Sequence, residues 1–141
     1  MVWAIAFVVI FIVIGGILAG YRDSGAVDYR MFGESKEGIF YYDIESITYP
    51  SNFTVDAWVK ENFSGPGVAA TSRALGQDYR NLDHSVSQVE LNCKDKTFRQ
   101  LSLTFYAKDG SVMSSSKNMV KEFEAIKPNS VNEALYKTLC K

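Results

Sequence analysis

The stretch 53–63, FTVDAWVKENF, alternates between apolar and polar side chains, and this alternation restricts the possible folds more than any other feature of the sequence. Successive side chains of a β-strand point to opposite faces, so a period of two predicts a half-buried strand. The residues expected to face inward are Phe53, Val55, Ala57 and Val59, and those expected to face outward are Thr54, Asp56, Trp58 and Lys60. Such a strand needs a sheet with one buried face.

A second predicted strand covers 39–47, which is rich in aromatic and β-branched residues. The residues predicted to share one of its faces are Phe40, Tyr42 and Ile44, and those predicted on the other are Tyr41, Asp43 and Glu45. Gly33 and Gly38 flank a charged tip just before it. This arrangement predicts a hairpin leading into the strand.

The segments 86–93 and 97–113 continue the pattern across a charged turn at 94–96. Asp109 and Gly110 mark a further hairpin, because glycine tolerates the positive φ of tight turns. The residues predicted to share a face are Val89, Leu91 and Cys93 on one strand, and Leu101, Leu103 and Phe105 on the next. The strands are therefore expected to form an antiparallel meander.

A helix is predicted at the C-terminal end of the sequence. Pro128 stops the preceding segment, Ser130 can cap the helix, and Glu133 completes a capping box. An apolar residue then recurs at every fourth position, Val131, Leu135 and Leu139, and this stripe would lie on the sheet. The predicted fold class is α+β: a small antiparallel sheet of about five to six strands with a C-terminal α-helix packed on one face, preceded by an N-terminal hydrophobic membrane helix.

Residues 1–20 contain no ionisable side chain and are long enough to cross a membrane as a helix. They lack the basic start of a typical signal peptide, so a retained anchor is favoured over cleavage after Ala26. We expect a linker at 21–29 and one domain at 30–141. Arg22 and Asp23 nearly cancel at the only charged flank, so charge does not set the orientation in the membrane.

The formal net charge is -1, with acidic residues in excess before residue 92 and basic residues in excess after it. One folded domain mixes these halves on its surface, and no dense basic patch is visible in the sequence. Nucleic acid is therefore not an expected partner.

Residues 64–85 interrupt the strand pattern with Gly, Pro and Ser and contain only a brief helical run at 69–75. The sequence predicts a long connection, either functional or mobile. His84, the only histidine, lies at its end beside Asp83, which is half of a general-base arrangement. No nucleophile motif accompanies the pair, and one histidine with two distant cysteines matches no zinc spacing. We expect no catalysis, no metal and no cofactor.

The chain has two cysteines, Cys93 at the end of a predicted strand and Cys140 at the end of the predicted helix. Each could be a nucleophile, a metal ligand or half of a disulfide. No base or activating group is evident near Cys140, which argues against a nucleophile. A cysteine pair behind an export segment is typical of an oxidising compartment, so 21–141 is expected outside the cytoplasm.

Several segments together resemble the surface-adhesin protein E family of bacterial exported proteins. They are YYDIESI, DAWVK, VELNCKDKTFRQLSLTFYAKDGSV and IKPNSVNEALYKTLCK. The residues that carry the resemblance, in order, are Tyr42, Asp43, Trp58, Glu90, Cys93, Phe98, Arg99, Tyr106, Asp109, Gly110, Pro128, Ser130, Glu133, Ala134, Leu135 and Cys140. The resemblance covers most of 39–141.

The resemblance implies a small antiparallel sheet with a C-terminal helix tied to it by a Cys93–Cys140 disulfide. Closing such a loop would stabilise the domain by about 4 kcal/mol in the chain-entropy model. The family name implies adhesion to host extracellular-matrix proteins. Tyr21 stands where a lipoprotein signal would need cysteine, so a lipid anchor is not expected.

The leading hypothesis is a non-catalytic, exported binding or adhesion module, periplasmic or at the cell surface and tethered by residues 1–20. Its partner would be a protein or a matrix or envelope component, and Tyr41, Trp58 and Tyr79 are the candidate binding residues. A structural accessory subunit of a membrane or envelope assembly is the alternative, and an enzyme centred on His84 ranks last. The sequence allows a homodimer without specifying one.

Overall fold

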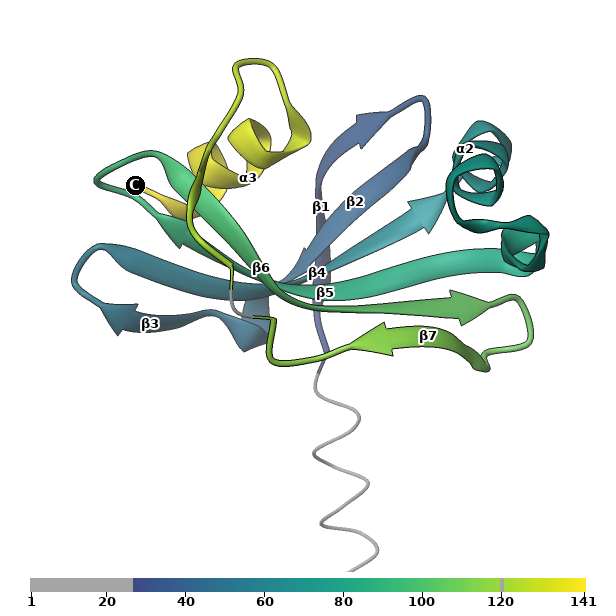
Figure 1. The fold of residues 1–141 in the computed structure, drawn as a ribbon. Coiled ribbons are helices and arrows are strands. Elements are labelled where there is room, and N and C mark those ends of the chain that lie inside the picture. The colour runs from purple at the N-terminus through teal and green to yellow at the C-terminus, as the bar shows by residue number, and fades with distance from the viewer. Residues whose placement is uncertain (1–26, 120) are drawn as a thin grey trace, which may run out of the picture.

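The computed structural model describes residues 27–119 and 121–141, which form one antiparallel sheet with two α-helices (Figure 1). The strands are β1 (Tyr29–Ser35), β2 (Gly38–Asp43), β3 (Thr48–Ser51), β4 (Thr54–Phe63), β5 (Leu82–Asn92), β6 (Thr97–Ala107), β7 (Val112–Ser116) and β8 (Glu124–Ala125). The helices are α2 (Gly65–Leu75) and α3 (Val131–Leu139), with 3-10 turns η1 (Ile44–Ser46) and η2 (Gln77–Asn81). The expected membrane segment, 1–20, lies outside the described residues.

The sheet order is β1-β2-β4-β5-β6-β7, with β3 paired to β4 and β8 paired to β6. The α+β class and the antiparallel arrangement are confirmed. The expectation of about five to six strands is wrong, because the sheet has 8. The additional strands β3 and β8 are only 4 and 2 residues long, and β3 contains Pro50, so neither shows a usable alternation.

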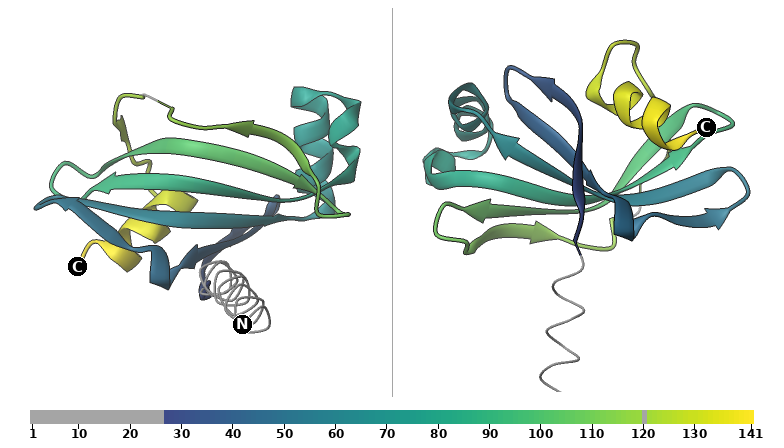
Figure 2. Two further views of the ribbon diagram at one scale, coloured as in Figure 1. Left: turned by 90° about the horizontal axis from the view of Figure 1, so that it is seen from below. Right: turned by 180° about the vertical axis from the view of Figure 1, so that it is seen from behind.

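The sheet has an inner face, which carries the core and the helices, and an outer face. Val55, Val59, Val89 and Leu91 point inward from the two central strands and pack against Leu135 of α3. Each such side chain contributes about 1.5–3 kcal/mol when fully buried. α2 lies at the far end of the sheet from α3, with the β1–β2 hairpin between the two helices (Figures 1 and 2).

The prediction of a long connection at 64–85 is wrong. The segment forms α2 and η2, and β5 already begins at Leu82. Ser64 caps α2 by accepting a hydrogen bond from the Gly67 amide, and Pro66 is tolerated because it lies in the first helical turn. The predicted helical run at 69–75 is thus part of α2. The run Gly65, Pro66, Gly67 has low helix propensity, which explains why the first turn was not predicted.

Two strand boundaries differ from expectation. β2 ends at Asp43, so Ile44 and Glu45 lie in η1 and not on the predicted strand. The Asp43 carboxylate caps η1 through the Glu45 amide at 3.0 Å and also accepts from the Asp28 amide at 3.0 Å, which stops the strand there. Phe53 precedes β4 and is 51% exposed, contrary to its predicted inward position.

A β-bulge in β6 changes the predicted faces. Gln88 of β5 pairs with Ser102, but its neighbour Val89 pairs with Gln100, so Leu101 is an extra residue. Leu103 and Phe105 line the inner face as expected, whereas Leu101 borders an outer groove with Ser102. Alternation counted along the sequence fails at such an insertion.

Candidate functional site

The predicted disulfide is present. Cys93, just after β5, bonds to Cys140, just after α3, with their Cα atoms 5.4 Å apart, and the described residues include no free cysteine. The Tyr136 hydroxyl donates a hydrogen bond to the Cys93 carbonyl at 3.0 Å, a second tie between the same elements. The two cysteines therefore hold α3 on the sheet.

Glu133 organises the start of α3. Ser130 Oγ accepts from the Glu133 amide at 3.2 Å, which is half of the predicted capping box, but Glu133 Oε1 accepts from the Asn129 amide and not from that of Ser130. Lys96 Nζ donates to Glu133 Oε2 at 2.9 Å. The lysine bond, followed by the amide bond, lowers the pKa of Glu133 to about 2.

Asp56, Glu90 and Arg99 are neighbours across three strands on the outer face. Asp56 points outward as predicted but is buried. Beside it on this face, the centre of the Phe123 ring lies 4.4 Å from the Arg99 guanidinium carbon. Arg99 Nε donates to Glu90 Oε1 at 2.7 Å. Burial raises the pKa of Asp56 to about 7, the adjacent Glu90 adds to the rise, and Arg99 opposes it.

The outer face also carries a partly exposed aromatic surface. The outer patch consists of Tyr29, Tyr41, Trp58, Lys60, His84 and Tyr106. Trp58 is 38% exposed and borders a groove of about 450 Å³. Tyr41 is half-buried and lies opposite Lys60 in the strand register, diagonal to Trp58. Lys60 Nζ lies 5.3 Å from the centre of the Tyr29 ring.

Tyr79, the third predicted binding residue, lies elsewhere. Its hydroxyl donates to Ser114 Oγ at 3.0 Å, and its ring packs edge-on against Phe105 at 5.6 Å. These contacts fasten η2 to β6 and β7. The structure thus places Tyr41 and Trp58 on one face and separates Tyr79 from them.

His84 lies within β5 and not in a loop. Its ring stacks on Tyr106 at 4.7 Å between centres, and its Nδ1 lies 2.7 Å from Asp83 Oδ2. Among residues 27–119 and 121–141, no three His, Cys, Asp or Glu side chains are grouped so that they could hold a metal ion.

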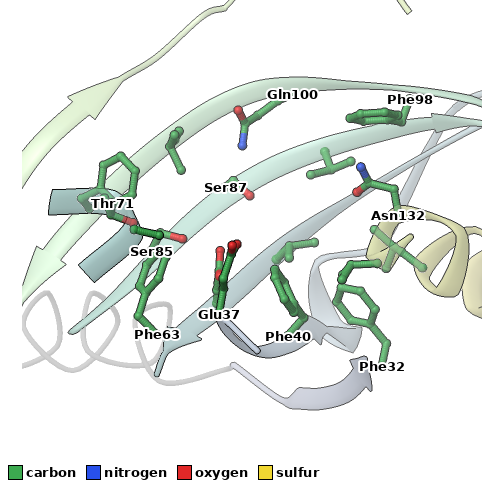
Figure 3. A pocket seen from close by; sticks show the side chains of 18 of the residues that line it. Phe32, Glu37, Phe40, Phe63, Thr71, Ser85, Ser87, Phe98, Gln100 and Asn132 are labelled. Atoms are coloured by element: carbon green, nitrogen blue, oxygen red, sulfur yellow. The ribbon is translucent and has the colours of Figure 1, made fainter. Parts of the chain in front are cut away.

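The inner face holds a cavity of about 640 Å³ between α2 and α3, here called the inner cavity (Figure 3). Its aromatic lining consists of Phe32, Phe40, Phe63, Phe98 and Phe105. Ala70, Ala74 and Leu75 of α2 close one side, and Val131 and Leu135 of α3 close the other. The cavity is the part of the inner face that α3 does not cover.

A few polar groups interrupt this apolar lining. Ser85 and Ser87 of β5 are buried in its floor, with 5% and 7% of their surface exposed. Glu61 of β4 and Glu37 of the β1–β2 turn contribute two carboxyl groups. Burial, followed by the charge of Glu37, raises the pKa of Glu61 to about 7.

The inner cavity was not predicted from the sequence, although β5 contains a signal for it. Ser85 and Ser87 are in phase with the buried Val89 and Leu91, so two small polar residues occupy positions where a packed core would place large apolar ones. Glu61 is likewise in phase with the inward side chains of β4.

The family model of surface-adhesin protein E matches residues 29–141, and the chain belongs to this family. The match begins at the first residue of β1 and includes both cysteines of the disulfide. No curated protein and no solved structure matches the chain significantly. Within the described ranges, no helix has the length and apolar character needed to span a membrane.

Proposed function

We propose that this chain is a non-catalytic adhesion module, displayed outside the cytoplasm and tethered to the membrane through residues 1–20. Membership of the surface-adhesin protein E family supports adhesion. The Cys93–Cys140 disulfide supports an exported location, because such bonds persist mainly in oxidising compartments. The partner is a protein or a component of the extracellular matrix or the cell envelope.

The outer patch is the proposed contact surface, and its uncovered Trp58 is the observation that carries this assignment. Tryptophan and tyrosine are enriched among the residues that dominate the binding energy of protein interfaces. In the outer patch, the tryptophan and tyrosine side chains lie on paired strands near Lys60 of β4. Because their backbone is already ordered, binding costs little conformational entropy.

The test is binding of the full-length protein to a panel of immobilised extracellular-matrix proteins and envelope polysaccharides. Trp58→Ala and Tyr41→Ala are expected to weaken binding about tenfold or more, as for central interface residues. Tyr49→Ala is the matched control, since Tyr49 is an aromatic residue of β3, 71% exposed and outside the outer patch.

Two results would contradict the proposal. The first is absence of binding to every member of the panel, and the second is an equal loss for Trp58→Ala and Tyr49→Ala. Purification of the native protein in a stable complex with envelope proteins would instead favour an accessory subunit.

A further inference from the structure

We propose that the inner cavity binds a small amphipathic organic cation. The apolar body of the ligand would lie among the phenylalanine rings (Figure 3), and its ammonium group would lie beside Glu61 and Glu37. This site lies on the opposite face of the sheet from the outer patch. The inference therefore does not depend on the proposed adhesion surface.

The size and lining of the cavity fit a small molecule. Ligand sites typically enclose about 300–1,000 Å³ and combine hydrophobic and aromatic walls with a few polar groups. The inner cavity has about 640 Å³ and walls from the sheet, both helices and the β1–β2 hairpin.

The floor of the cavity contains polar groups that a packed core would not contain. Ser85 and Ser87 are more than nine-tenths buried as whole residues, and both line the cavity. Figure 3 shows both residues in the floor between the aromatic rings. Ligand sites typically place a few such polar groups among apolar walls, so a ligand with a hydrogen-bonding group would bond to these hydroxyls.

The charge of the lining favours a ligand with a positive charge. Two carboxylates, Glu37 and Glu61, line the cavity, whereas its described lining includes no Lys, Arg or His. Neither carboxylate forms an ion pair within the described ranges. A cation would relieve the repulsion between them, and an anionic ligand would meet only like charge.

Contacts with the backbone fix the position of Glu61 and of the turn that carries Glu37. The Glu61 side chain lies against Gly38, where an added Cβ would come within 3.1 Å of Glu61 Oε2. The hairpin turn that carries Glu37 is fixed to the start of α2, because the Ser64 amide donates to the Glu37 carbonyl at 3.0 Å and Ser64 Oγ donates to the Lys36 carbonyl at 2.6 Å. The acidic end of the cavity is thus built by three connected elements, β2, β4 and α2.

The experiment compares three probes that share one ring system: 1-naphthylmethylammonium, 1-naphthylmethanol and 1-naphthylacetate. Each is titrated into the purified full-length protein in detergent by calorimetry, with the same detergent alone as the blank. The ammonium probe is expected to bind about tenfold or more tightly than the alcohol, because a charge-assisted hydrogen bond replaces a neutral one. The carboxylate probe is expected to bind most weakly.

Variants assign the binding to the inner cavity. Glu61→Gln is expected to remove the preference for the ammonium probe while leaving binding of the alcohol unchanged. Glu34→Gln is the matched control, since Glu34 is an exposed residue of the same hairpin and outside the cavity lining. Ala74→Trp, on the exposed α2 side of the cavity, is expected to reduce binding of all three probes by occupying the space for the ring.

Affinity for the ammonium probe is also expected to rise from pH 6 to pH 8, because Glu61 must be ionised to pair with it. Glu37 is the other titratable group in the described lining, at the same end of the cavity as Glu61, so Glu37→Gln should shift this dependence to lower pH without abolishing it. Equal affinity for the three head groups, tighter binding of the carboxylate, or binding unaffected by both Glu61→Gln and Ala74→Trp would overturn the proposal. Absence of binding by all three probes would overturn it as well.

Discussion

Asp56 is a carboxylate that the sheet buries beside a second carboxylate, with one of its oxygens left without a hydrogen bond within the described residues. Arg99 pairs with Glu90 and so neutralises only one of the two acids. The strand register forces the acids together, because Asp56 of β4 lies directly opposite Glu90 of β5. The folded state therefore favours the protonated form of Asp56.

Asp56→Asn is expected to stabilise the protein at pH 8 by on the order of 1 kcal/mol, after allowance for solvent screening, and to stabilise it less at pH 5. The amide cannot ionise, whereas Asp56, with a pKa of about 7, becomes charged between these pH values. Urea denaturation at both pH values measures the difference. Asp95→Asn, in an exposed turn, is the control, and a loss of stability for Asp56→Asn at pH 8 would contradict the account.

The outward direction of Asp56 and Trp58 could be predicted from the sequence, because alternation along one strand is a local property. The burial of Asp56 could not, since it depends on the pairing that places Glu90 of β5 and Arg99 of β6 beside it. Similarly, Tyr79 was predicted from the sequence as a binding residue. Its side chain instead packs on Phe105 and bonds to Ser114, contacts that form only in the folded sheet.

At the scale of elements, α2 depends on one close approach of two backbones. A Cβ added at Gly67 would lie 1.9 Å from the Glu37 carbonyl oxygen, whereas one added at Gly65, in the same helical turn, would meet nothing within 4 Å. The hairpin turn and the helix start can thus touch only because residue 67 has no side chain.

Gly67→Ala is expected to destabilise the protein by about 1–3 kcal/mol, the usual cost of overpacking, because the hairpin must move away from α2. Gly65→Ala should be neutral or slightly stabilising, since alanine is the better helix former. Thermal denaturation of the two variants measures the contrast. Equal effects of the two substitutions would show that helix propensity and not the contact with Glu37 is decisive.

Helix α3 spans only 9 residues and depends on its ties to the sheet. Replacing both cysteines, Cys93→Ser with Cys140→Ser, is expected to lower the unfolding free energy by about 4 kcal/mol in the chain-entropy model. Tyr136→Phe, which removes only the hydrogen bond to the Cys93 carbonyl, should cost about 1 kcal/mol.

Denaturant titration of the non-reduced proteins gives both numbers, and mass spectrometry of the wild type should find no free thiol. Two titratable thiols in the wild type, or a double-serine variant no less stable than Tyr136→Phe, would contradict this role for the disulfide.

Helices and strands could be predicted from the sequence where a local signal was strong. They could not be predicted where contacts with other elements determine the structure. The start of α3 at Val131 follows from its cap and apolar stripe. The start of α2 is stabilised by Ser64, which bonds to the β1–β2 turn, and no pattern within 64–75 reports that contact. The bulge at Leu101 is equally invisible, because an extra residue becomes apparent only when β6 is paired with β5.

At the scale of the whole molecule, the inner face is longer than α3 can cover. Along β5 the inward residues change from Ser85 and Ser87, near α2, to Val89 and Leu91, near α3. This change divides the inner face into a packed half and an open half. The α+β class was predictable from periodicity, but the inner cavity was not, since it depends on how far a helix extends over the sheet.

The ionisable groups of the molecule predict a stability that is highest at mildly acidic pH. Glu133 has its pKa lowered from 4.5 to about 2, so its contribution is fully present above pH 4.5 and is lost as the pH falls toward 2. Asp56 and Glu61 have pKa values raised to about 7, so the folded state binds protons more tightly and loses stability as the pH rises from about 4 to 7. The two trends place the maximum between pH 4 and pH 5.

Urea denaturation from pH 3 to pH 8 measures this profile. Glu133→Gln is expected to reduce the loss of stability on the acidic side, because the neutral glutamine still accepts the hydrogen bond at the start of α3 and does not titrate. At pH 7 this variant should be less stable than the wild type. Glu61→Gln combined with Asp56→Asn is expected to flatten the decline above pH 5. Glu122→Gln, an exposed residue, should leave the profile unchanged. A wild-type maximum at pH 7 or above would contradict the assignment, because the two buried carboxyls could then not be protonated in the folded state at neutral pH.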